Sequence, residues 1–322
     1  MRRRCKRQYS DEQQFWFWWN ECHTHHAKIQ LNPSQIMEIE LLRQDESFGG
    51  QVKTYRHTSV ANKCEMQFSI YLPPAKNKNK APILTWLSGL TCNEDTFMIK
   101  SGAQRIASEL GIVIVAPDTS PRGDDIPDDQ EGAYDFGLGA GFYVDALEDP
   151  WKQNYNMYSY VTKELNEIVY ANFQVDKNRH GIFGHSMGGH GALTIGLKNP
   201  NSYKSISAFA PICNPINCPW GKKALSNYLG DDQNDWSNYD ASELIEKDMV
   251  QTPRNPVLID QGLSDEFLER ELNTDHFEEI CEAKNANMII RRHSGYGHGY
   301  YFISTFMEDH LKHHAKYLSD ED

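Results

Sequence analysis

The feature that most constrains this chain is a serine between glycines, with an apolar segment before it and small residues after it. Residues 181–183 (Gly-Ile-Phe) predict a short buried strand, and residues 184–188 (Gly-His-Ser-Met-Gly) form a G-x-S-x-G pattern. Residues 191–197 are expected to open a helix. A strand, a sharp turn and a helix in this order are the setting of a nucleophile elbow. We therefore interpret Ser186 as a nucleophile; the alternative is a glycine-rich turn with an incidental serine.

The residue types of this segment follow from the geometry of such a turn. A serine at its apex lies in strained backbone, and the flanking glycines relieve crowding because they carry no Cβ. The helix that follows presents free backbone N–H groups at its N-terminus, where an anion is stabilised. The pattern thus suits a serine that forms an anionic intermediate.

Length, charge and cysteine content narrow the class of protein. At 322 residues the chain can bury a sizeable core, and α/β enzymes of this length are often one domain. A formal net charge of -13 argues against nucleic acid, and the lack of a long uncharged apolar run argues against a membrane span. The seven cysteines form no C-x-x-C pair, which predicts neither a zinc site nor a redox dithiol. Free thiols are typical of a reducing compartment, so we expect a cytoplasmic protein.

Residues 1–36 differ from the rest of the chain. They contain six basic and three acidic residues, whereas the whole chain is acidic. They also contain an aromatic run at residues 15–19 and three histidines, His23, His25 and His26, without further metal ligands at a defined spacing. We interpret residues 1–36 as a disordered or artefactual extension and expect residues 37–322 to form a single domain.

Strand-like and helix-like segments alternate after this extension. Strands are expected at residues 66–72, 83–87, 111–116, 181–183, 205–210, 257–259 and 288–290. Helices are expected at residues 103–110, 158–171, 275–283 and 300–317, besides the helix after the serine. Because parallel strands need crossover connections, this alternation predicts an α/β fold with a mostly parallel sheet. The long, acidic, glycine-rich segment 118–150 is expected to be a loop that shapes a site.

A nucleophilic serine needs a base that takes its proton and a third group that orients the base. In this type of fold the order along the chain is serine, acid, histidine. Two aspartates follow strand 257–259: we favour Asp265, which lies in a loop, over Asp260, which ends the strand. For the base we favour His298, immediately before the last helix, over His293, which lies nearer the preceding strand.

An oxyanion hole requires two backbone N–H donors. One is expected from Met187, the residue after the serine, and the other from the loop after strand 83–87. In that loop Gly89 allows a turn whose backbone N–H groups face the site. We expect the donor to be Leu90 or a residue next to it. Cys92 lies in the same loop and is expected beside the site.

Several further segments carry a family pattern, in order and spread over residues 46–318. They are WLSGLTC (86–92), DTSPRG (118–123), GAGFYVDA (139–146), EDPW (148–151), FGHSMGGHGAL (183–193), APICNP (210–215), CPWGKKA (218–224) and YYFI (300–303). Together they resemble the S-formylglutathione hydrolase family, also called esterase D. The resemblance implies an α/β-hydrolase fold, in which helices flank a mostly parallel central sheet. It also implies a serine esterase that needs no metal or organic cofactor and forms a homodimer.

The family's serine, aspartate and histidine fall on Ser186, Asp265 and His298. The implied reaction is hydrolysis of the thioester S-formylglutathione to glutathione and formate, part of formaldehyde detoxification. This chain departs from the family at Gly297 and Gly299, where the family has aspartate and serine beside its histidine. Two polar neighbours that would steady the histidine loop are therefore missing.

The remaining expectations concern the substrate pocket. Glutathione is charged, so polar groups are expected at the mouth of the pocket; the candidates are Lys100, Arg122 and Lys152. Trp86, Trp151 and Trp220 are candidates for its walls, with packing under loops as the alternative. Two other functions stay open: a carboxylesterase that acts on small acetyl esters with the same residues, and a non-catalytic binding module on a hydrolase scaffold.

Overall fold

The computed structural model describes residues 38–75 and 79–319. The chain divides into two units, Met1–Asn32 and Pro33–Asp322, and all described residues belong to the second. The expectations about the aromatic run and about His23, His25 and His26 concern residues outside the described ones. No helix in the described ranges is long and apolar enough to cross a membrane.

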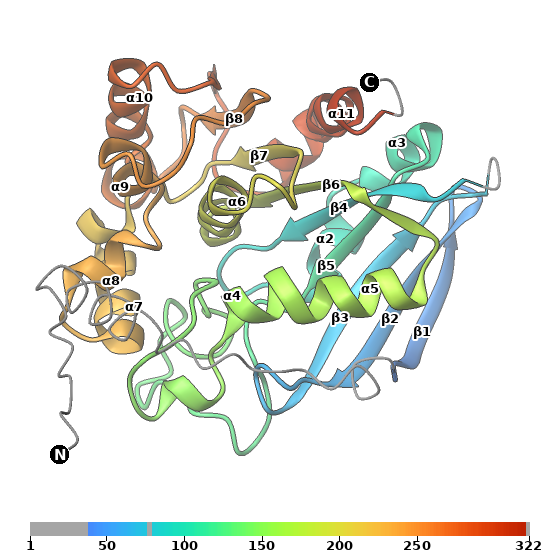
Figure 1. The fold of residues 1–322 in the computed structure, drawn as a ribbon, viewed down its shortest axis with the longest axis horizontal. Helices are drawn as coiled ribbons and strands as arrows, with labels where there is room; N and C mark the ends of the chain where they lie inside the picture. The colour runs from blue at the N-terminus through green and yellow to red at the C-terminus, as the bar shows by residue number, and fades with distance from the viewer. Residues whose placement is uncertain (1–37, 76–78, 320–322) are drawn as a thin grey trace, which may run out of the picture. The chain divides into compact units, whose positions relative to one another are not determined.

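A nine-stranded sheet forms the centre of this unit (Figure 1). Its strands are β1 (Glu40–Ser47), β2 (Gly50–Thr58), β3 (Glu65–Leu72), β4 (Ala81–Leu87), β5 (Val113–Pro117), β6 (Val175–His185), β7 (Ser205–Phe209), β8 (Val257–Gly262) and β9 (Met288–His293). They lie side by side in the order β1-β2-β3-β5-β4-β6-β7-β8-β9. The first three strands and the β3–β5 pair are antiparallel, and all later pairs are parallel. The mostly parallel sheet is therefore confirmed.

Helices connect the strands and cover both faces of the sheet. They are α2 (Glu94–Lys100), α3 (Ala103–Leu110), α4 (Met157–Ser159), α5 (Leu165–Asn172), α6 (Met187–Lys198), α7 (Pro219–Leu229), α8 (Gln233–Ser237), α9 (Ala241–Glu246), α10 (Thr274–Ala283) and α11 (Tyr300–Tyr317). A π-helical turn, Tyr160–Glu164, joins α4 to α5. The α/β fold that the alternation predicts and the α/β-hydrolase architecture that the resemblance implies are thus confirmed.

Side chains of strand β6 show that α6 and α11 lie on opposite faces of the sheet. Ile182 lies against α6, where a Cβ added to Gly196 would be 3.2 Å from its Cγ2 atom. The next residue, Phe183, packs against His314 of α11, with ring centroids 5.3 Å apart. Because successive side chains of a strand point to opposite faces, the two helices sandwich the sheet.

The structure corrects several expected boundaries. Helix α6 begins at Met187, directly after the serine, rather than at Gly191. Close packing requires glycine in the first turn of this helix, because a Cβ on Gly189 would lie 2.8 Å from Pro211. Strand β8 runs to Gly262, three residues beyond the expected end, because its pairing with β9 continues that far. Strands β1 and β2 were not expected; β1 is exposed along most of its length and has no apolar alternation.

Candidate active site

The backbone of Ser186 has the strain expected of a nucleophile elbow. It lies between β6 and α6 with φ 57° and ψ -120°, a conformation that is rare for a residue with a side chain. The flanking glycines are required by close backbone approach. A Cβ on Gly188 would lie less than van der Waals distance from the carbonyl of Leu87, and one on Gly184 would lie 2.7 Å from the same oxygen. The elbow is therefore clamped against the end of β4.

Asp265 and His298 are brought together by two neighbouring loops. Nδ1 of His298 lies 2.6 Å from Oδ2 of Asp265, whose side chain is fully buried. The same carboxylate accepts hydrogen bonds from the Phe267 N–H at 2.9 Å and from Nε2 of Gln261 at 3.3 Å. These bonds hold the carboxylate in one orientation, so it fixes the tautomer of His298 with a proton on Nδ1.

Backbone contacts hold the loop after β8 against the loop after β9. The Ser264 N–H donates to the Tyr296 carbonyl at 2.9 Å, and the Leu263 N–H donates to the His293 carbonyl at 2.9 Å. A Cβ on Gly262 would clash with the backbone carbonyl of Tyr296 and lie 2.9 Å from that of Gly297, so only glycine fits there. The histidine loop is thus fastened to the loop after β8 through its backbone.

Two rings lie beside the imidazole of His298. The His185 ring is centred 4.5 Å away and the Phe267 ring 4.9 Å away. Burial, with a smaller effect from His298, holds the pKa of His185 well below its ordinary value. His185 is therefore a neutral neighbour that packs against His298.

Asp260 belongs to a separate buried cluster. Its carboxylate accepts from Nε and Nη2 of Arg291, both at 2.6 Å, and lies 3.2 Å from ring nitrogens of His293 and His310. Burial alone would raise the pKa of Asp260, but the bonds from His310 and Arg291 bring it well below its ordinary value. The alternative acid and the alternative histidine, His293, thus lie together, and neither faces His298.

Ser186 and His298 line a cavity of about 310 Å³. Its other lining residues are Gly89, Leu90, Thr91, Cys92, Thr96, Lys100, Tyr134, His185, Trp220, Phe267, Gly299 and Tyr300. The cavity joins the loop after β4, the histidine loop and the start of α7. Sequence reasoning placed Leu90, Cys92 and Trp220 here but missed Thr96, Tyr134 and Tyr300; the lone signal for Tyr300 was its place directly after the histidine loop.

The loop after β4 passes directly beside the serine. A Cβ on Gly89 would lie 3.1 Å from Cβ of Ser186. Thr91 has φ 65°, and its N–H donates to the Gly139 carbonyl at 2.9 Å, which ties this loop to the long segment 118–150. Within the described residues the Leu90 N–H has no acceptor. Met187 opens α6, so its N–H has no partner inside the helix.

Two of the three tryptophans do not reach the cavity. Trp86 is fully buried between Phe97 and Phe183, and its Nε1 donates to Oγ of Ser88 at 2.8 Å. Trp86 therefore supports the loop after β4 through Ser88 instead of lining the pocket. Trp151 packs among other aromatic rings, 5.1 Å from the Tyr155 ring. The expectation that Trp86 and Trp151 form walls of the pocket is therefore wrong. Both side chains pack in the core beneath the cavity.

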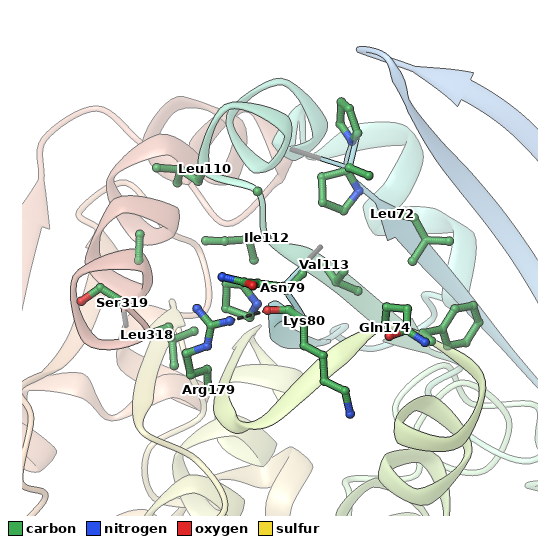
Figure 2. A pocket seen from close by; sticks show the side chains of 18 of the residues that line it. Leu72, Asn79, Lys80, Leu110, Ile112, Val113, Gln174, Arg179, Leu318 and Ser319 are labelled. Carbon is green, nitrogen blue, oxygen red and sulfur yellow. Dashed lines mark hydrogen bonds between the residues drawn. The ribbon is translucent and has the colours of Figure 1, made fainter. Parts of the chain in front are cut away.

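A second cavity, of about 870 Å³, is bordered by Leu72, Ile112, Val113 and Leu318, whose side chains are labelled in Figure 2. It lies where β4 and β5 begin, whereas the serine follows the end of β6. Parallel strands begin at one edge of a sheet and end at the other, so this cavity is remote from the candidate active site. Among residues 38–75 and 79–319, no group of three or more His, Cys, Asp or Glu side chains is arranged to hold a metal.

Comparisons with known proteins agree with this geometry. The Esterase family model matches residues 59–313. The S-formylglutathione hydrolase of Rattus norvegicus is 54% identical over 284 residues, which cover 88% of this chain and 100% of that protein. The Arabidopsis thaliana S-formylglutathione hydrolase is 54% identical and covers 84% of this chain and 95% of its own length. The solved S-formylglutathione hydrolase of Agrobacterium tumefaciens superimposes with a TM-score of 0.84 at 48% identity, covering 87% of this chain and 100% of that one. The resemblance found in the sequence is confirmed.

Proposed function

Because this chain belongs to the S-formylglutathione hydrolase family of serine esterases, we propose that it hydrolyses S-formylglutathione to glutathione and formate. The observation that carries the proposal is the 2.6 Å contact between Asp265 and His298 beside the cavity that Ser186 also lines. A nucleophile, a base and a group that orients the base are the parts that acyl transfer needs.

The first half of the reaction transfers the formyl group to the enzyme. Oγ of Ser186 attacks the thioester carbon while Nε2 of His298 takes the hydroxyl proton, and Asp265 stabilises the imidazolium that forms. The backbone N–H groups of Met187 and Leu90 stabilise the oxyanion, each contributing about 3 kcal/mol. The carbon–sulfur bond then breaks, and glutathione leaves with the proton that His298 returns.

The second half releases formate. Water attacks the formyl-enzyme while His298 takes a proton from it, a second oxyanion forms in the same place, and the Ser186 oxygen leaves with the returned proton. Every step uses side chains and backbone groups of the chain itself, without a cofactor. In the cell this reaction would complete formaldehyde detoxification by removing its glutathione thioester.

The ratio of specificity constants tests the proposal. The kcat/KM for S-formylglutathione should exceed that for p-nitrophenyl acetate by at least about a hundredfold, since remote contacts with glutathione contribute only with the first substrate. A ratio near one or below would favour a carboxylesterase. Labelling of the wild type by a fluorophosphonate, and its loss in Ser186→Ala, would exclude a non-catalytic module; no labelling would support one.

A further inference from the structure

The candidate active site has a charge opposite to that of the chain as a whole. The chain carries a formal net charge of -13, yet the residues that line the cavity include a lysine, Lys100, and no aspartate or glutamate. A cavity lined by one sign of charge raises the local concentration of substrate with the other sign. The lining therefore selects for an anion within a protein that otherwise repels anions.

The cavity is also larger than an acyl group as small as formyl requires. Its volume, about 310 Å³, is at the lower end of the range for pockets that hold whole small-molecule ligands. Most of this space must therefore hold the leaving group. Glutathione has two carboxylates and one ammonium group at neutral pH, so it presents net negative charge to the lining.

The ammonium of Lys100 is available for such a ligand. Lys100 ends helix α2, and among the described residues no carboxylate lies within ion-pair distance of its Nζ atom. That atom lies over the Tyr300 ring, 5.7 Å from the ring centroid. Tyr300 lines the cavity from the start of α11, so the ring holds the ammonium at the cavity by a cation–π contact.

The other two cationic candidates from the sequence are already paired. Nε of Arg122 donates to Asp118 at 2.7 Å, and its Nη2 donates to the Cys92 carbonyl at 3.1 Å. Nζ of Lys152 donates to Asp149 at 2.6 Å, and Lys152 does not line the cavity. Arg122 thus supports the loop from behind, and Lys152 is a surface ion pair.

We propose that Lys100 binds a carboxylate of the leaving thiol and so determines specificity for glutathione thioesters over neutral esters. This inference rests on the proposed function and adds to it the residue that recognises the substrate. The reacting carbon is at Ser186, and the carboxylate is held at the C-terminal end of α2. The contact exists in the ground state as well as in the transition state, so its loss raises KM more than it lowers kcat.

Steady-state kinetics of the wild type and four variants with two substrates test this inference. The ratio of kcat/KM for S-formylglutathione to that for p-nitrophenyl acetate should fall about five- to tenfold in Lys100→Met and further in Lys100→Glu. Lys100→Arg should keep most of the wild-type ratio, because it keeps the positive charge. Lys152→Met is the matched control, a lysine outside the cavity, and should keep the wild-type ratio. Equal ratios in Lys100→Met and Lys152→Met would overturn the inference.

Inhibition by S-methylglutathione, measured against p-nitrophenyl acetate, separates this inference from the proposed function. The inhibition constant should rise about five- to tenfold in Lys100→Met and should depend on ionic strength in the wild type alone. If the wild type fails to hydrolyse S-formylglutathione, the proposed function fails, whatever the inhibition constants are. If the wild type hydrolyses it but the inhibition constant is the same in both proteins, Lys100 is not the recognition residue.

Discussion

Asp265 lies 2.6 Å from Nδ1 of His298, whereas Asp260, five residues earlier, forms a partly buried ion pair with Arg291. The two carboxylates are close in sequence but have separate partners because β8 continues to Gly262 before the chain turns. Asp260 therefore points from within the strand toward β9 and α11, and Asp265 lies beyond the sheet edge. One carboxylate is placed to orient a base, and the other is placed to join elements of the fold.

Replacement of the two aspartates should separate these roles. Asp265→Asn should lower kcat for S-formylglutathione by about 10²- to 10⁴-fold with little change in melting temperature, because an amide favours the wrong histidine tautomer. Asp260→Asn removes the carboxylate charge beside Arg291, which keeps Asp309 as a partner, and should destabilise the protein by about 1–3 kcal/mol, with a smaller effect on kcat. Both quantities are measured well below the melting temperature of the weaker variant. A larger loss of kcat in Asp260→Asn, at equal folded fraction, would make Asp260 the catalytic acid.

The histidine loop offers a site for stabilisation. Gly299 is the N-cap of α11, has φ -89°, makes no side-chain capping bond, and has no heavy atom within 4 Å of an added Cβ. Gly299→Ser should therefore cap the helix and restrict the unfolded chain, raising the melting temperature by about 1–3 °C. Gly295 has equally open space but φ 81°, so Gly295→Ser should lower the melting temperature. Scanning calorimetry measures both melting temperatures. A fall for Gly299→Ser would contradict the assignment of the cap, and a rise for Gly295→Ser would contradict the argument from its positive φ.

Cys92 lies in the loop after β4 and lines the cavity, so alkylation should block the substrate. Burial raises the pKa of its thiol, with a smaller opposing effect from Lys100, so the reaction with maleimide should be slow at neutral pH and faster as pH rises. We expect maleimide to inhibit the wild type and Cys92→Ser to resist it. Cys64→Ser is the control, a partly exposed cysteine outside the cavity. Equal inhibition of wild type and Cys92→Ser would remove Cys92 from the site.

Glu94 should make stability depend on pH. Burial, and then the charge of Asp118, raises the pKa of Glu94 from 4.5 to about 7. Because the folded state holds this proton more tightly than the unfolded state, stability should fall as pH rises from about 4.5 to about 7. Glu94→Gln removes this dependence. The melting temperature of Glu94→Gln minus that of the wild type should therefore rise across that window and stay constant above it. Glu167→Gln, on the exposed face of α5, is the control; a gap for Glu94→Gln that is constant with pH would contradict the assignment.

The sequence predicted elements whose pattern is local. The bounds of α3 and α11 were predicted correctly because each has apolar helical periodicity and a clear boundary residue. The end of β8 was not predictable, because it depends on pairing with β9. The hydrogen bonds of His310 and His314 were not predictable either, because they depend on how α11 packs against the sheet. The two histidines lie one helical turn apart and contact Ser207 and Ser205, which share one face of β7.

Site residues that depend on loop packing were likewise not separable by sequence. Trp86 and Trp220 were equal candidates for the pocket wall, yet Trp86 is buried in the core and Trp220 lines the cavity. Lys100 was one of three equal candidates until the partners of Arg122 and Lys152 were known. Whether a charged side chain can bind a substrate depends on its ion-pair partners, and these partners are set by the tertiary structure.

The central claim is that Ser186 forms the acyl-enzyme with His298 as its base. The most direct measurement is kcat for S-formylglutathione in the wild type, Ser186→Ala and His298→Ala, with folding checked by circular dichroism. We expect each replacement to lower kcat by at least about 10³-fold, and the double variant to be little worse than either, because the residues act as a unit. A folded Ser186→Ala protein that keeps more than about a tenth of wild-type kcat would contradict the claim.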